Sequence, residues 1–221
     1  LTSTAFGNLA PDAEWLVQYP YGCAEQLASR LIGLLAIEEP AKRFRLSIRS
    51  EKPLKQLIEE DLAGLLECQR SDGGFGYWPD ADYYDESGGN PSLSTHVALA
   101  LASAREHGYE VPKRVMDRLV AFLKTATFVS GLDPEWALRY RVLQAVALKA
   151  LGTDFTQHYG ELMTKRKALP LIDWVRLDGL LQRRPQWQKQ ADDLYTDIKE
   201  REWITERGAH LEEWKDAARW W

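Results

Sequence analysis

The segment 19–26, with the sequence YPYGCAEQ, holds two residues whose side chains could react with each other. Cys23 and Gln26 are three residues apart at the start of an expected helix, so their side chains lie on one face within reach. The positive end of a helix stabilises a thiolate and an oxyanion on a nearby carbonyl. Attack of the thiolate on the carboxamide would expel ammonia and leave an internal thioester. Such a masked electrophile survives only while water is excluded, which the aromatic side chains of Tyr19 and Tyr21 would help to arrange.

Two other interpretations of Cys23 stay open at this point. A free cysteine at a helix start is commonly a small buried hydrophobe. It could also be the nucleophile of a cysteine protease with a distant histidine as base, although Gln26 has no part in that chemistry. The Pro20-Tyr21-Gly22 sequence directly before Cys23 makes a chance match less probable. The second cysteine, Cys68, falls late in an amphipathic pattern and is expected to be a buried, inert thiol.

The composition of the 221 residues excludes several classes of protein. Lys and Arg number 28 against 33 for Asp and Glu, giving a net charge of −5. A general binder of nucleic acid or of an anionic membrane needs a basic surface, so we expect neither partner. No apolar run approaches the roughly 20 residues that span a bilayer. Two cysteines cannot build a disulfide framework.

Helical periodicity dominates the chain. The apolar positions from Ala24 predict a helix that Pro40 ends. Ser94 or Thr95 is expected to cap a later helix that runs to about residue 107. Further helices are predicted at 54–68, 112–126, 134–150, 155–167, 170–183, 187–202 and 209–220. Since no stretch alternates convincingly as a strand, the sequence predicts an all-α fold of stacked antiparallel helical hairpins.

The connection 71–91 is longer than the other turns and rich in glycine. Phe75, Tyr77 and Trp78 indicate that its first half is packed rather than loose. The acidic residues of its second half lack the spacing of a known calcium loop, and a solvated turn is favoured for Asp80, Asp82, Asp85 and Glu86. We therefore expect no metal site and no cofactor.

The motif PYGCAEQ at 20–26 resembles the thioester motif of the α2-macroglobulin and complement family. More specifically, the chain resembles the thioester domain of bacterial α2-macroglobulins. Residues 1–4 and 15–19 are similar to the lead-in of bacterial members, 69–78 to their glycine-rich turn, and 93–112 to the helix that follows. The resemblance covers nearly the whole chain. It implies that residues 1–221 are one thioester-containing domain, a fragment of a larger multidomain protein.

The resemblance implies a fold and a function. The fold would be an α/α toroid, a ring of antiparallel helical hairpins that is incomplete here because its C-terminal helices are missing. In the family, a protease cleaves a bait region elsewhere in the parent protein, which exposes the thioester and captures the protease covalently. The domain would thus be a single-use protease inhibitor and not an enzyme. The parent would be periplasmic or on the cell surface, lipid-anchored to a bacterial membrane, and active in bacterial defence, with neighbouring domains shielding the thioester.

The family's residue roles carry over only to matched positions. Cys23 would supply the thiol and Gln26 the acyl group, while Glu25 matches the acid between them, with helix stabilisation as an adequate explanation. In some complement relatives a downstream histidine attacks the thioester, a motif that has no match here. His96, near a helix start, is the most interesting of the four histidines, although a structural role is expected for it. Amines, chiefly lysines of the trapped protease, are then the expected acceptors.

Two further alternatives concern other helical toroids. The turn Gln69-x-x-Asp72-Gly73-Gly74-Phe75 is similar to turns in terpene cyclases and in the β subunits of protein prenyltransferases. A cyclase needs a D-x-D-D cluster, which residues 80–83 do not provide, and a prenyltransferase needs a zinc set of Asp, Cys and His that is not evident. The remaining alternative is a degenerate toroid without a thioester, serving as a protein-interaction module.

Overall fold

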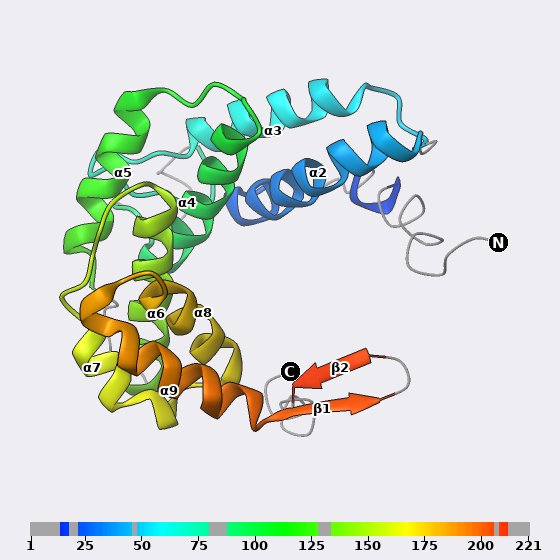
Figure 1. The fold of residues 1–221 in the computed structure, drawn as a ribbon. Coiled ribbons are helices and arrows are strands. Elements are labelled where there is room, and N and C mark those ends of the chain that lie inside the picture. Colours follow the sequence, from blue (N-terminus) through cyan, green and yellow to red (C-terminus); the bar gives the residue numbers. More distant parts are fainter. Residues whose placement is uncertain are drawn as a thin grey trace. The chain divides into compact units, whose positions relative to one another are not determined.

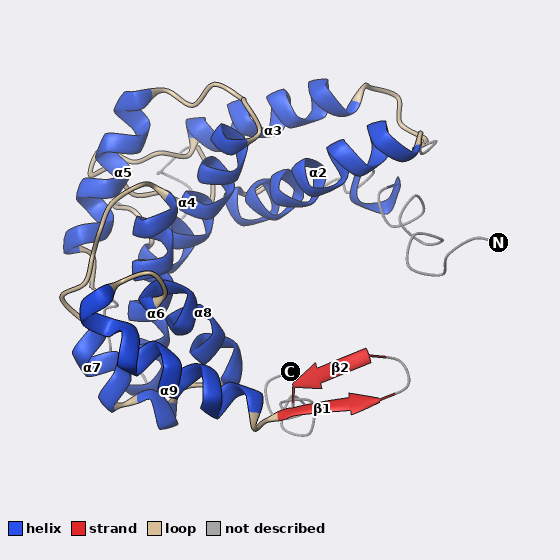
Figure 2. Ribbon diagram, viewed as in Figure 1, coloured by secondary structure: helices blue, strands red, loops and turns tan. Residues whose placement is uncertain are grey.

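A computed structural model of the chain describes residues 14–17, 22–45, 48–79, 88–127, 134–205 and 208–211, with side chains through residue 201. The chain forms two compact units, Leu1–Thr127 and Phe128–Trp221. Each unit is described by itself below. Figures 1 and 2 show that helices make up most of both units.

The first unit is built on the long helix α2 (Ala24–Phe44). It packs against α3 (Leu54–Glu67) and α4 (Pro91–Glu106), and α4 in turn contacts α5 (Lys113–Thr125). Aliphatic side chains at helical spacing face inward from all four helices, as the amphipathic pattern requires. The fully buried members of this core include Leu31, Leu34, Leu35, Ile58, Leu65, Leu101, Leu119 and Leu123.

A buried ion pair fixes α2 against α3. Arg30 Nε donates to Asp61 Oδ2 at 2.7 Å, and Arg30 Nη2 bonds to the other carboxylate oxygen. Asp61 is only 1% exposed. A bidentate pair of this kind has a defined geometry, so it sets how the two helices face each other.

The second unit contains α6 (Pro134–Ala150), α7 (Tyr159–Thr164), α8 (Leu171–Leu181) and α9 (Gln188–Lys199), with single 3₁₀ turns η2 (Arg166–Ala168) and η3 (Pro185–Trp187). Helix α8 packs against α6 and α9. Its core holds Trp174 and Leu177 among other apolar side chains. The buried carboxylate of Asp173 accepts bonds from Arg139 Nε at 3.0 Å and Arg176 Nη1 at 2.6 Å.

A two-stranded hairpin follows α9 and corrects one sequence prediction. Strand β1 (Glu202–Thr205) pairs antiparallel with β2 (Gly208–Leu211), in a register that places Thr205 opposite Gly208. The helix predicted at 209–220 is therefore wrong where the structure describes it. Trp203, Ile204 and Thr205 all favour strands, and a two-residue connection suits a tight hairpin.

Several helix limits also differ from the predicted ones. The helix predicted at 155–167 is shortened to α7 and is followed by η2, and the one predicted at 187–202 ends at Lys199. Helix α2 continues past Pro40 to Phe44 and ends at Arg45, whose φ is 51°. Proline removes one backbone hydrogen bond, and here the helix runs through that gap for one more turn. Helix α4 is capped by Asn90, whose side chain accepts from the N–H of Leu93 at 3.0 Å, and not by Ser94 or Thr95. Both of those residues are buried within the helix.

The predicted all-α class is confirmed, since the hairpin supplies the only named strands in the described part of the chain. The incomplete ring and the single domain over 1–221 stay predictions. None of the described helices has both the length and the apolar character needed to cross a membrane.

Candidate functional site

Cys23 and Gln26 are held together by the first turn of α2. Cys23 is the N-cap residue, with extended backbone angles of φ −68° and ψ 158°. Its backbone N–H donates to Gln26 Oε1 at 3.2 Å. The Cys23 side chain takes the reciprocal capping-box position towards the backbone N–H of Gln26. The thiol and the carboxamide therefore share one helix end, and both side chains are partly buried.

The bond to Gln26 Oε1 has a chemical consequence. If a thiolate adds to the carboxamide carbon, negative charge develops on Oε1. The Cys23 N–H already points at that oxygen, so it would act as an oxyanion donor. The first-turn N–H groups of α2 add a positive potential at the same place. The local geometry thus suits acyl transfer between these two side chains.

The start of α2 is anchored to the glycine-rich turn. The backbone N–H of Ala24 donates to the carbonyl of Tyr77 at 2.8 Å. This bond satisfies one of the N–H groups that a helix start leaves unpaired. The adjacent aromatic side chains, Tyr77 and Trp78, are 38% and 41% exposed. They therefore lie at the surface next to the residue that follows Cys23.

The turn itself is rigidly built. Gly73 has a φ of +96°, which an L side chain rarely adopts. Asp72 accepts the N–H groups of Gly74 at 2.9 Å and Gly89 at 2.8 Å, so its carboxylate ties the two ends of the connection together. Phe75 is fully buried, and its N–H donates to Ser94 Oγ at 2.9 Å. The prediction that the first half of this connection is packed is confirmed for Phe75, whereas Tyr77 and Trp78 are exposed.

His96 approaches α2 through a serine. Its Nε2 atom lies 2.9 Å from Ser29 Oγ, and that hydroxyl donates to Glu25 Oε1 at 3.1 Å. Burial lowers the pKa of His96, and the Glu25 carboxylate opposes that shift. Two residues that the sequence analysis singled out separately, Glu25 and His96, are therefore linked in space by Ser29.

The other candidate residues are placed as follows. Cys68 is fully buried at the end of α3, as predicted, and burial raises the pKa of its thiol to about 11. Tyr19 and Tyr21 lie outside the described residues, as do the acids at 80–87. Within the described ranges, no group of three or more His, Cys, Asp or Glu side chains could hold a metal ion.

Ser29, Asn90 and the carbonyl of Tyr77 were not found from the sequence. The Asn90-Pro91 pair is a capping signal that sequence reasoning overlooked. Ser29 and Tyr77 act through contacts with residues more than 50 positions away, so no local pattern could reveal them.

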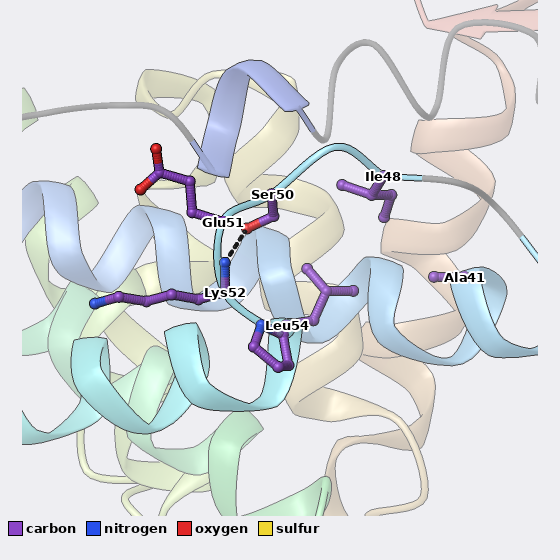
Figure 3. A pocket seen from close by; sticks show the side chains of 7 residues that line it. Ala41, Ile48, Ser50, Glu51, Lys52 and Leu54 are labelled. Carbon is purple, nitrogen blue, oxygen red and sulfur yellow. Dashed lines mark hydrogen bonds between the residues drawn. The ribbon is translucent and has the colours of Figure 1, made fainter.

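A surface pocket of about 440 Å³ lies at the other end of α2. Figure 3 shows its lining, in which the N–H of Lys52 donates to Ser50 Oγ at 3.2 Å. Its α2 residue, Ala41, is separated from Ala24 by 17 residues, or about 25 Å of helix. This pocket is therefore remote from Cys23 and takes no part in the candidate site.

Comparisons with known proteins point to one group. No protein-family model matches the chain. The chain is 33% identical over 132 residues to alpha-2-macroglobulin of Escherichia coli (strain K12), covering 56% of this chain and 7% of that protein. It is 32% identical over 169 residues to alpha-2-macroglobulin of Xylella fastidiosa, covering 70% of this chain and 10% of that protein. The chain thus spans a tenth or less of the length of these relatives.

The fold has solved counterparts in the same group. The crystal structure of Salmonella alpha-2-macroglobulin reacted with methylamine matches 91% of this chain and 13% of that chain, with a TM-score of 0.70 and 20% identity. At that identity the match establishes the fold alone. Membership of the family rests on the two sequence relatives.

Proposed function

The chain belongs to the alpha-2-macroglobulin family, and on that premise we propose that Cys23 and Gln26 form an internal thioester. The observation that carries the proposal is the paired geometry at the N-terminus of α2, where the Cys23 N–H donates to Gln26 Oε1 at 3.2 Å. The thiol and its acyl partner need to meet in one turn, and the N-cap and N3 positions provide that.

The chemistry balances in two steps. Cys23 Sγ adds to the Gln26 side-chain carbonyl carbon, a C–S bond forms, the C–N bond breaks, and nitrogen leaves as ammonia with the thiol proton. An amine nucleophile later attacks the same carbon, an amide bond forms, and the C–S bond breaks to release the Cys23 thiol. Each domain reacts once, so the domain is not a turnover enzyme.

The biological role that we infer is covalent protease inhibition by the parent protein. Cleavage of a bait region elsewhere in the parent protein by an attacking protease would expose the thioester, and a lysine of that protease would then be acylated by Gln26. The named relatives support this role, as does the methylamine-reacted Salmonella structure, because methylamine is a small amine nucleophile. A periplasmic or cell-surface location, with neighbouring domains that exclude water from the site, belongs to the same proposal.

Intact mass of freshly purified, non-reduced protein tests the thioester. We expect a mass one ammonia below the value calculated from the sequence, and a shift to the methylamide after methylamine treatment. Cys23→Ala should show the full calculated mass and no response to methylamine. Cys68→Ala is the matched control and should react as the unaltered chain does.

Three outcomes separate the candidate functions. A full mass with an unreactive Gln26, in this chain and in the longer parent, would overturn the thioester and leave a protein-interaction module. A mass equal to the calculated value plus the change from Gln to Glu at position 26 would show a thioester that formed and then hydrolysed. Reaction with methylamine in Cys23→Ala would show a different electrophile.

A further inference from the structure

A second pocket, in the unit Phe128–Trp221, is lined mainly by cationic side chains. It has a volume of about 430 Å³ and lies at the C-terminal end of α8. Its lining comes from Lys149 of α6 and from Gly179, Gln182, Arg183 and Arg184. Three of these five residues carry a positive charge and none is acidic.

Part of this charge stabilises the end of α8. Lys149 Nζ bonds to the carbonyl of Gly179, and Arg184 Nε donates to the carbonyl of Leu180 at 2.9 Å. Cations near a helix C-terminus satisfy its last carbonyls and its negative dipole end. The contact uses one of the three N–H groups of Lys149, and the exposed side chain leaves the other two open to solvent or to a ligand.

Arg184 is held in place by its neighbours. Its two terminal nitrogens bond to the two carboxylate oxygens of Asp154, with the Nη1–Oδ2 distance at 2.9 Å. Its guanidinium carbon lies 5.6 Å from the centre of the Tyr159 ring. A cation fixed on three sides in this way is pre-organised, which reduces the entropy that a ligand must overcome.

The positive charge around the pocket is not balanced. Asp154 is committed to Arg184, and Asp178 accepts from the Gln182 amide at 2.9 Å. Among the described residues, no carboxylate forms an ion pair with Arg183 or Lys149. Burial and the two arginines lower the pKa of Lys149, against the opposing effect of Asp154. The pocket therefore holds cations that repel one another.

The backbone at Arg183 is unusual for a charged residue. Its φ is 63°, and the only other non-glycine residue with a positive φ in the described part of the chain is Arg45. Just past a helix end this conformation normally belongs to glycine. This conformation is sterically less favourable for an arginine than for a glycine.

We propose that Lys149, Arg183 and Arg184 bind a small oxyanion of the phosphate class in this pocket. The planar fork of Arg183 matches two oxygens of a tetrahedral anion, while Lys149 and Arg184, whose fork is already bonded to Asp154, add positive charge. The anion would come either from free phosphate or from a phosphate group exposed on a lipid headgroup. This site is separate from Cys23 and Gln26, so it does not depend on the proposed thioester.

Titration calorimetry of the full chain with inorganic phosphate at low ionic strength tests the site. We expect saturable binding with one equivalent per chain, weakened about tenfold in Lys149→Gln and again in Arg183→Gln, because each variant removes a charge-assisted hydrogen bond. Lys189→Gln, which removes an exposed cation elsewhere in the unit, is the matched control and should bind as the unaltered chain does.

Arg183→Gly separates binding from folding. Glycine accepts a positive φ without strain, so this variant should keep or raise the melting temperature while losing about tenfold in phosphate affinity. A variant that binds phosphate as tightly as the unaltered chain would contradict the role of Arg183.

A second arm identifies the source of the anion. Vesicles containing phosphatidic acid are compared with vesicles of phosphatidylcholine alone, with and without competing inorganic phosphate. Binding to the acidic vesicles that the Lys149→Gln variant loses would support a lipid headgroup. Binding of inorganic phosphate alone would support the free ion. Absence of both, or an equal loss in Lys189→Gln, would overturn the site.

Discussion

The imidazole Nε2 of His96 lies 2.9 Å from the hydroxyl oxygen of Ser29, so a residue of α4 is tied to the second turn of α2. Ser29 passes this contact on to Glu25, which lies beside Gln26 in the first turn of α2. His96 is therefore connected to the candidate site through the Ser29 hydroxyl and the Glu25 carboxylate.

The stability of the protein should depend on the protonation of His96. Its pKa is lowered by burial, so the folded state favours the neutral ring. The stabilisation is then complete above the unfolded-state pKa of about 6.5 and is lost as the pH falls through the folded-state pKa. Denaturant unfolding at a series of pH values should show a free energy of unfolding that declines below neutrality, less steeply in His96→Gln. An identical decline in this variant would contradict the assignment.

His158 provides the control for that experiment. Burial and Arg141 lower its pKa too, so it contributes a decline of the same sign. His158→Gln should reduce the pH dependence without altering the chemical shifts of Ser29, whereas His96→Gln should alter both.

Removal of the Glu25 charge should lower the pKa of His96 further. The carboxylate is the influence that raises this pKa against burial. In Glu25→Gln the imidazole proton signals should titrate at a lower pH than in the unaltered protein, as measured by NMR. Glu39→Gln, an exposed substitution near the other end of α2, should leave the titration unchanged.

The glycine-rich turn should not accept a methyl group at Gly74. A Cβ there would meet the Phe122 ring at 2.6 Å and Gly89 Cα at 2.7 Å. Overpacking of this kind costs about 2 kcal/mol. We expect Gly74→Ala to lower the free energy of unfolding by that amount and to slow thioester formation, because the turn carries the Tyr77 carbonyl. Gly160→Ala, whose Cβ would meet nothing closer than 3.9 Å, should be neutral or stabilising.

Asp173 should be the most costly carboxylate to remove from the second unit. It is fully buried and accepts from both Arg139 and Arg176. Asp173→Ala leaves two partly buried guanidinium groups without their partner, which costs about 3 kcal/mol. Chemical denaturation compares it with Asp192→Ala, an exposed carboxylate whose loss should change stability by less than about 0.5 kcal/mol. Equal effects of the two variants would contradict the role of Asp173.

The two cysteines should differ in their reactivity towards alkylating reagents. Burial raises the pKa of Cys68 to about 11, so at pH 8 it holds almost no reactive thiolate, while Cys23 is partly exposed. On the thioester proposal, native protein should show no rapidly alkylated thiol, one after methylamine, and two after denaturation of the methylamine-treated protein. Rapid native alkylation of Cys68, located by peptide mass analysis, would contradict its burial.

Local features of the fold were predictable from the sequence, and distant contacts were not. Helix α6 has its predicted limits because Pro134 is a strong starting signal. The nearness of Cys23 to Gln26 also followed from spacing, since one helical turn determines it. The approach of His96 to Ser29 depends on how α4 packs against α2, which one-dimensional periodicity does not encode. The hairpin was missed because its strands are only four residues long.

The bond between the Ala24 N–H and the Tyr77 carbonyl has a consequence for the order of events during biosynthesis. Cys23 and Gln26 meet as soon as one helical turn forms, yet the anchor of that turn is supplied by a segment translated 53 residues later. A nascent chain therefore contains both reactants well before it contains their support. Formation of the proposed thioester would thus be a late step of maturation. An intact thioester would then indicate that the first unit had finished folding.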